Sequence, residues 1–207
     1  MKKLLFVLFV VLLTTHLKCQ DLPIIGKRMP TIPVLDINGN SAFIKPNMNA
    51  GKPYIIVTWH HWNSFSVRML QNLNAVYAEW QNQTGVKIIA LHCDKAENIP
   101  AAKNTISQKG WNFTYFFDPE LKGFCNALDV KPRGAPEIII CNSKADIMWD
   151  NVGYISTEVV YSELLKVVSN PELTSKTTQA TSKTTYIPPA AKPLPFIDDF
   201  TDNKNGW

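Results

Sequence analysis

The chain has 207 residues, of which 45% are hydrophobic and 18% charged, and this balance excludes a wholly disordered or collagen-like chain. Its length suits one globular domain with tails, or two small domains at most. The net charge of +4 comes largely from Lys2, Lys3 and Lys18, and because the rest of the chain is nearly neutral and has no basic cluster, we expect no nucleic-acid partner.

Residues 1–19 have the pattern of a signal peptide. Two lysines precede an apolar run from Leu4 to Leu13, and a polar stretch follows. That run is about ten residues long, whereas a membrane-spanning helix needs roughly 20. We therefore predict cleavage after Cys19 and export to the periplasm or the medium, with no membrane span in the mature chain. The alternatives are a lipid anchor at Cys19, although Leu17 and Lys18 stand where lipid-attachment motifs have small residues, and a buried N-terminal helix.

Between residues 24 and 168 the hydrophobic pattern alternates between the periods of strands and helices. Pro30 and Pro33 bracket a short strand, and a turn at 38–40 connects it to a second strand at 42–44. The predicted order is a β-hairpin followed by β, α, β, α, β, α, β, β and α. These later elements are expected near 54–59, 65–80, 87–92, 101–108, 111–117, 121–128, 137–141, 147–152 and 157–168.

Two of these helices are predicted to be amphipathic. The first long helix has apolar residues every three or four positions, at Phe65, Met69, Leu70, Leu73, Val76, Tyr77 and Trp80. The last helix, which we expect Ser156 to cap, has them at Val159, Val160, Leu164, Leu165 and Val168. Helices of this kind alternating with buried strands predict an α/β domain.

The C-terminal part of the chain differs in composition. A Thr-Ser-Lys-Thr-Thr sequence at 174–178 recurs at 181–185, and a proline-rich run follows. We interpret residues 169–195 as an extended linker, because such a composition cannot bury a core. The last twelve residues, 196–207, resemble the first strand of exported β-sandwich modules of the concanavalin or laminin-G kind. A partner-binding tail and a disordered terminus are the alternatives.

The cysteines within the predicted domain are Cys93, Cys125 and Cys141, and no two cysteines of the chain have Cys-x-x-Cys spacing. Cys93 and Cys141 each end an apolar stretch, where cysteine usually behaves as a small hydrophobic residue. We therefore expect three buried free thiols, with a single Cys93–Cys125 disulfide as the alternative.

Several short motifs stand in an order found in one protein family. Residues 36–40 read Asp-Ile-Asn-Gly-Asn, close to the family's Asp-x-x-Gly-Lys hairpin, and residues 59–62 read Trp-His-His-Trp where it has Trp-Ala-Thr-Trp. Residues 134–136, Gly-Ala-Pro, match a loop whose proline is cis. On these motifs residues 24–168 resemble the thioredoxin-like superfamily, specifically the TlpA/ResA-type (redoxin or AhpC/TSA-like) thiol-disulfide oxidoreductases. The resemblance implies a three-layer α/β sandwich, with a central mixed sheet, flanking helices and an N-terminal β-hairpin.

The resemblance also locates the family's redox motif, Cys-x-Pro-Cys, at residues 63–66. Here these residues are Asn-Ser-Phe-Ser, so Asn63 and Ser66 replace the two cysteines. Disulfide exchange needs an accessible, acidic thiolate and a second thiol, which an amide and an alcohol do not supply. The assisting acids of related proteins align with Val57 and Met69. We therefore predict a degenerate site without catalytic residues.

The residues at this degenerate site have a purely structural explanation. Asn63 is a strong helix N-cap residue, and Ser64 and Ser66 can satisfy the amides of the first helical turn. This interpretation explains the helix start and assigns the site no function.

A binding module is the interpretation that we favour for function. Thioredoxin-like domains hold extended peptides against the loop before the cis-proline by backbone hydrogen bonds. Ala135 and Pro136 would preserve that edge for an extended peptide or protein partner, and Trp59, Trp62 and Phe65 would give it an apolar floor. Because side chains alternate along a strand, at least one of the two tryptophans is expected to be buried.

Histidines and thiols provide the remaining candidates. His60 and His61 follow one central strand, and His92 and Cys93 end its neighbour, so zinc or copper could find ligands at that edge of the sheet. Adjacent strand residues face opposite ways, however, and copper-carrying relatives use two close cysteines that are lacking here. We assign no metal and no cofactor. The alternative function is a thiol-disulfide oxidoreductase or antioxidant protein of the cell envelope, with Cys125 as its outside candidate for a peroxidatic residue.

Overall fold

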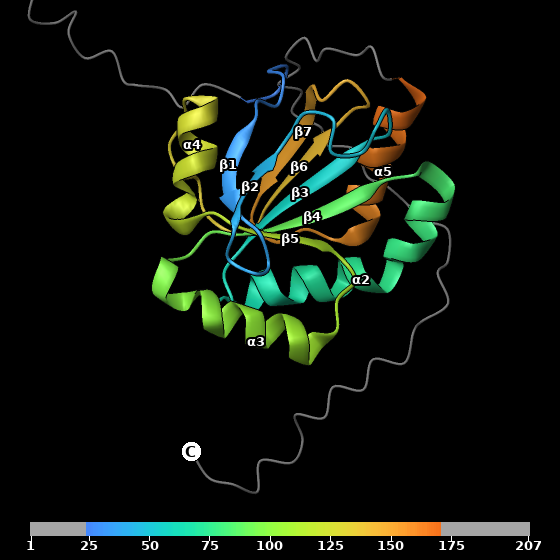
Figure 1. Ribbon diagram of the computed structural model, residues 1–207. Coiled ribbons are helices and arrows are strands. Elements are labelled where there is room, and N and C mark those ends of the chain that lie inside the picture. The colour runs from blue at the N-terminus through green and yellow to red at the C-terminus, as the bar shows by residue number, and fades with distance from the viewer. Residues whose placement is uncertain (1–23, 171–207) are drawn as a thin grey trace, which may run out of the picture. The chain divides into compact units, whose positions relative to one another are not determined.

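The computed structural model describes residues 24–170 (Figure 1). The predicted signal peptide (1–19), all but the first two residues of the linker (169–195) and the tail (196–207) lie outside these residues. No helix within residues 24–170 is long and apolar enough to cross a lipid bilayer.

The described residues form one seven-stranded sheet with the strand order β2-β1-β5-β4-β3-β6-β7. The strands are β1 (Ile32–Leu35), β2 (Ser41–Ile44), β3 (Tyr54–Trp59), β4 (Lys87–His92), β5 (Thr114–Phe117), β6 (Glu137–Cys141) and β7 (Ile147–Val152). The α-helices in this part of the chain are α2 (Ser64–Thr84), α3 (Ile99–Lys109), α4 (Lys122–Leu128) and α5 (Thr157–Ser169). Short 3₁₀ turns, η1 (Ala96–Asn98) and η2 (Pro119–Leu121), precede α3 and α4.

Helices cover both faces of the sheet. Along β3, Ile55 and Val57 belong to the core shared with α2, α3 and α5, whereas Ile56 belongs to the core shared with α4. All six residues of β3 are buried, because both faces of this central strand are covered. The predicted three-layer α/β architecture is confirmed, with the hairpin β1-β2 at one side of a mixed sheet.

The strand register brings distant parts of the chain to one edge of the sheet. β3 pairs in parallel with β4, so that Trp59 lies beside His92. β6 is antiparallel to β3 and places Glu137 opposite Thr58. β7 is antiparallel to β6, so its last residue, Val152, also pairs with Glu137. We call this edge, formed by the ends of β3, β4 and β7 and the start of β6, the site edge.

Helix α2 begins at the site edge because Asn63 caps it. The backbone of Asn63 is extended (φ −88°, ψ 111°), and its Oδ1 accepts hydrogen bonds from the N–H groups of Phe65 at 2.9 Å and Ser66 at 3.1 Å. The predicted N-cap is therefore confirmed. The helix ends at Gly85, whose left-handed backbone (φ 71°) favours glycine.

Three details of the sequence-based prediction are wrong. Pro33 lies inside β1, opposite Phe43 of β2, rather than beyond the strand. Phe65, predicted on the apolar face of the long helix, is exposed instead, because it occupies the first turn of α2, before the helix reaches the core. Helix α5 is rotated from the predicted orientation, and its 3.6-residue period buries Val160, Leu164 and Val167 but exposes Val159, Leu165 and Val168.

Candidate functional site

Asn63 stands at the N-terminus of α2 on the site edge, at the position where the resemblance predicts the first redox cysteine. While its Oδ1 caps the helix, its Nδ2 donates a hydrogen bond to the backbone carbonyl of Ala135 at 3.1 Å. Both ends of the side chain are therefore engaged in the structure. An amide also has no ionisable proton near neutral pH, so Asn63 supplies no nucleophile.

Neither Ser66, at the predicted second redox position, nor any cysteine among the described residues is an accessible nucleophile. Ser66 is fully buried, and its Oγ has no hydrogen-bond partner among the described residues. Cys93, Cys125 and Cys141 are buried and free, as predicted, and the alternative Cys93–Cys125 disulfide is not formed. Burial raises the pKa of Cys93 to about 12, that of Cys125 to about 11 and that of Cys141 to about 12. These thiols are therefore protonated at neutral pH.

Three exposed aromatic residues lie near Asn63 on the site edge. Trp62 is 63% exposed, Phe65 58% and Tyr154 39%, and the rings of Phe65 and Tyr154 are 6.3 Å apart. We call these three residues the aromatic surface. Sequence reasoning missed Tyr154, which follows β7. The position of Tyr154 could have been inferred from the topology, because β7 is antiparallel to β6 and therefore ends at the site edge.

Trp59 is completely buried and is not part of the aromatic surface. Its ring packs edge-on against His92, with centroids 5.0 Å apart, and against Trp111 at 5.7 Å. The structure therefore decides between the two tryptophans, burying Trp59 and exposing Trp62. Trp59 therefore packs in the core under the site edge and cannot contact a ligand on the surface.

The peptide bond between Ala135 and Pro136 is cis. Pro136 is buried, and its carbonyl accepts a hydrogen bond from the N–H of Gly153 at 2.7 Å. Ala135 is partly exposed; its carbonyl accepts from Asn63, and its N–H forms no hydrogen bond within residues 24–170. Of the two loop residues among the predicted binding residues, Ala135 and Pro136, only Ala135 presents a free backbone group.

An ion-pair network anchors the loop that precedes β6. Arg133 pairs with Glu137 and also with Asp150 of β7, at 2.6 Å. Glu137 is almost fully buried, and burial raises the pKa of its carboxyl group even though the charge of Arg133 opposes the shift. The network joins the loop to β6 and β7, and it thereby holds Ala135 in position beside Asn63.

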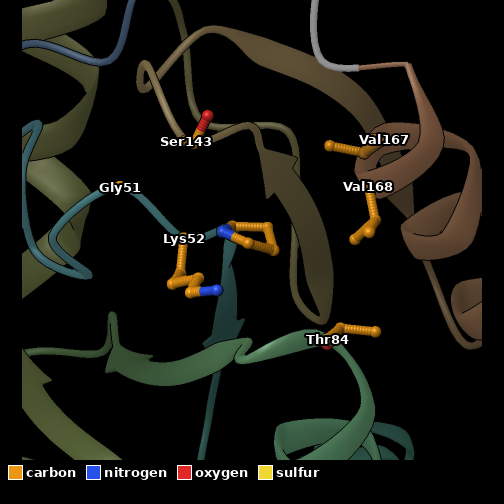
Figure 2. A pocket seen from close by; sticks show the side chains of 7 residues that line it. Gly51, Lys52, Thr84, Ser143, Val167 and Val168 are labelled. Carbon is orange, nitrogen blue, oxygen red and sulfur yellow. The ribbon is translucent and has the colours of Figure 1, made fainter.

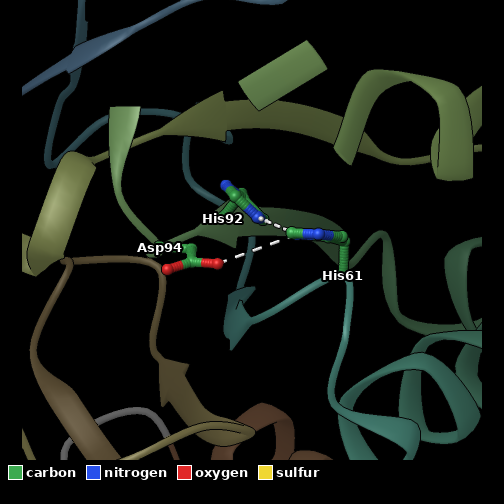
Figure 3. Close-up of side chains that lie close together, drawn as sticks. All are labelled: His61, His92 and Asp94. Carbon is green, nitrogen blue, oxygen red and sulfur yellow. Dashed lines mark hydrogen bonds and ion pairs between the residues drawn. The ribbon is translucent and has the colours of Figure 1, made fainter. Parts of the chain in front are cut away.

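A second polar cluster lies on the site edge, formed by the last residue of β4 and by the loops after β3 and β4 (Figure 3). His61 Nδ1 is 3.4 Å from His92 Nε2 and 3.8 Å from Asp94 Oδ2. Burial, together with the neighbouring His61, lowers the pKa of His92 to about 4. His60 faces elsewhere and stacks on Trp62, with ring centroids 4.9 Å apart.

Asp94 is the member of this cluster that sequence reasoning missed. Partial burial raises its pKa, but hydrogen bonds from the Lys95 backbone and the side chains of Trp62 and Asn98 outweigh burial and hold the pKa below its usual value. Trp62 Nε1 donates to Asp94 Oδ2 at 2.7 Å. Its sequence position could have identified Asp94 as a site residue, because it follows His92, the end of a central strand, by two residues.

A cavity of about 200 Å³ lies away from this site (Figure 2). It is bounded by residues before β3 and at the ends of α2 and α5, which place it at the edge of the sheet opposite Asn63. Its lining residues are Gly51, Lys52, Pro53, Thr84, Ser143, Val167 and Val168. With a lysine as the only ionisable side chain in its lining, the cavity offers no acid-base pair.

Residues 25–149 match the family model described as AhpC/TSA family. The chain is similar to an uncharacterized thioredoxin-like protein from Porphyromonas gingivalis, with 26% identity and a TM-score of 0.56 over 69% of this chain and 92% of that one. A putative thiol:disulfide interchange protein DsbE from Chlorobium tepidum has 17% identity and a TM-score of 0.58, over 70% and 97% of the two chains. A secreted disulfide oxidoreductase from Mycobacterium tuberculosis has 17% identity and a TM-score of 0.52, over 67% and 96%. No curated protein sequence matches the chain.

Proposed function

The chain belongs to the AhpC/TSA family of the thioredoxin-like superfamily, as its motifs predicted, and we propose that it binds an extended peptide or protein segment without exchanging disulfides. The observation that carries this proposal is the pair of roles of the Asn63 side chain, which caps α2 and bonds the Ala135 carbonyl. The position of the attacking thiol in redox-active relatives is thus taken by a group that stabilises the scaffold and cannot react with a disulfide.

The buried thiols support the absence of redox chemistry. At pH 7, a thiol with a pKa of about 11 is ionised in roughly one molecule in ten thousand, and thiol-disulfide exchange requires the thiolate. A buried thiol also has no access to a protein disulfide. The alternative function, a thiol-disulfide oxidoreductase or antioxidant protein, would need one of the described thiols to become exposed and acidic.

The backbone of Ala135 and the aromatic surface support peptide binding. Because the Ala135 carbonyl already accepts from Asn63, the free group is its N–H, and a bound segment would offer a carbonyl oxygen to it. Phe65 and Tyr154 present apolar rings beside this position. Aromatic residues of this kind provide much of the binding energy at protein interfaces. The occupant is therefore an extended segment with an apolar or aromatic side chain.

Disulfide turnover tests the first half of the proposal. We expect the natural chain not to accelerate reduction of insulin by dithiothreitol, whereas the double variant Asn63→Cys with Ser66→Cys accelerates it. The single variant Ser66→Cys is the matched control, because it lacks the attacking thiol. A silent natural chain with an active double variant would identify an intact scaffold that lacks only its thiols. Turnover by the natural chain would overturn the proposal.

Binding to an unfolded protein tests the second half. The probe is fluorescently labelled α-lactalbumin, reduced and carboxymethylated so that it carries no thiol, and the readout is fluorescence anisotropy. We expect Phe65→Ala and Tyr154→Ala each to weaken binding about tenfold. Phe43→Ala is the control, because Phe43 is 51% exposed but lies on the edge strand β2. Absence of binding, or an equal loss in the Phe43 variant, would contradict the proposal.

We also propose that the protein is exported. The signal-peptide pattern of residues 1–19 supports this, as does the secreted disulfide oxidoreductase with the same fold. Mass spectrometry of the protein from its native host should find a mature N-terminus at Gln20. An acylated N-terminal Cys19 would show that the exported protein is lipid-anchored. An intact N-terminus in the cytoplasmic fraction would contradict export.

A further inference from the structure

His61, His92 and Asp94 bring three metal-ligating atoms together within 4.8 Å of one another on the site edge (Figure 3). We propose that these residues form a site for a divalent transition-metal ion, Zn²⁺ being the ion that suits the ligands best. The site shares no ligand atom with the proposed peptide-binding residues Ala135, Phe65 and Tyr154, although Trp62 of the aromatic surface donates a hydrogen bond to Asp94.

The distance between the two imidazoles fits a shared metal ion. Two nitrogens bound to zinc at 2.0–2.1 Å and separated by a tetrahedral angle lie about 3.3 Å apart. His61 Nδ1 and His92 Nε2 are 3.4 Å apart. Asp94 Oδ2 is 3.8 Å from His61 Nδ1, so a small rotation of the Asp94 side chain, which is 14% exposed, completes a three-ligand set.

The surroundings hold these three side chains close to one another before any ion binds, and only the Asp94 carboxylate has to move towards the imidazoles. The His92 ring is held edge-on between Trp59 and Phe117, with centroids 5.0 and 5.7 Å away. Asp94 is held through Oδ2 by the side chains of Trp62 and Asn98, and through Oδ1 by the backbone N–H of Lys95. Such outer hydrogen bonds orient metal ligands and strengthen binding.

The ligand types select among metals. Two imidazoles with one carboxylate suit zinc and its transition-metal neighbours, whereas Ca²⁺ and Mg²⁺ take mainly oxygen ligands. The nearby Cys93 contributes no sulfur, because its Sγ bonds the Trp59 carbonyl at 3.5 Å. His61 and Asp94 are partly exposed, so solvent can reach the fourth coordination position. Three protein ligands and one open position are the arrangement of reactive rather than purely structural zinc sites.

Calorimetric titration of the metal-stripped full chain with Zn²⁺ tests the proposal. We expect one ion per chain. His61→Ala and Asp94→Asn should each weaken binding at least tenfold, since even the loss of a ligand's hydrogen-bond partner costs that much. His60→Ala is the matched control, because His60 is adjacent in sequence but offers no atom to the cluster. Unfolding curves of each variant show whether it remains folded.

Electron paramagnetic resonance of bound Cu²⁺ gives a second readout, which would not change if His61 had only a structural role. The natural chain should show hyperfine coupling to two ligand nitrogens, and His61→Ala to one. The proposal fails if Zn²⁺ does not bind, if His61→Ala binds as tightly as the natural chain, or if His60→Ala loses as much affinity as His61→Ala.

Discussion

The side-chain amide of Asn63 donates to the backbone carbonyl of Ala135, 72 residues further along the chain, at 3.1 Å. This hydrogen bond joins the N-terminus of α2 to the loop before β6. The family resemblance predicts the redox motif at the first of these two segments. Here they are fastened to each other by a residue that also satisfies the amides of Phe65 and Ser66.

Asn63 is therefore expected to contribute to stability in two separable ways. Asn63→Ala removes the cap and the bond to Ala135, and should lower the free energy of unfolding by about 1–3 kcal/mol. Asn63→Ser keeps a capping oxygen but cannot reach Ala135, so its loss should be about 0.5–1.5 kcal/mol. Urea denaturation measures both. Ser64→Ala, in the exposed first turn, is the control; equal losses in all three variants would contradict these roles.

The ion pair between Arg133 and Glu137 should be sensitive to the loss of one partner. Arg133→Leu leaves the nearly buried Glu137 carboxylate without its main counter-charge, and we expect a loss of about 3–5 kcal/mol. Adding Glu137→Gln should recover part of this loss. The exposed pair between Lys166 and Glu163 provides the comparison, and Lys166→Ala should cost less than about 1 kcal/mol. Similar losses at the two sites, measured by urea denaturation, would refute this expectation.

Asp118 should make stability depend on pH. Burial raises its pKa above 3.8, although the N–H groups of Gly123 and Phe124 donate to its carboxylate at 2.8 and 2.7 Å. Between 3.8 and the raised pKa, the folded chain binds a proton that the unfolded chain has lost. This contribution to stability is therefore complete below 3.8 and is lost as pH rises through the folded pKa.

The comparison that isolates this effect is between the natural chain and Asp118→Asn. The difference in their free energies of unfolding should shrink as pH rises above 3.8, because the natural chain loses the contribution of the protonated carboxyl group. A difference that grows with pH would mean that the two backbone hydrogen bonds outweigh burial and lower the pKa of Asp118.

The three described thiols should be unreactive in the folded protein. Cys93, Cys125 and Cys141 are buried, and the pKa values of Cys125 and Cys141 are about 11 and about 12. Ellman's reagent should label the native Cys19→Ser variant far more slowly than the same variant in guanidinium chloride. Rapid labelling of one thiol in the native protein would contradict this and would make that cysteine a candidate nucleophile.

The order of strands and helices and the cap of α2 could be predicted from the sequence because their causes are local. Strand and helix periods depend on neighbours two to four residues away, and an N-cap bonds amides within its own first turn. That Asn63 and Ser66 replace the redox cysteines stays a prediction from the resemblance, in which the flanking motifs set the register. Cys141 was expected to be buried because it ends an apolar strand, and it is.

The partners of the site residues depended on tertiary structure, because they come from segments joined only by strand pairing. At least one buried tryptophan was predicted, and the helices on both faces of β3 bury Trp59, whereas Trp62 lies in the loop beyond the strand. Beyond the strand end no period applies, so the loop conformation alone determines that His61, and not His60, faces His92. The bond from Asn63 to Ala135 likewise requires β6 to lie beside β3, since no local pattern links residues so far apart in sequence.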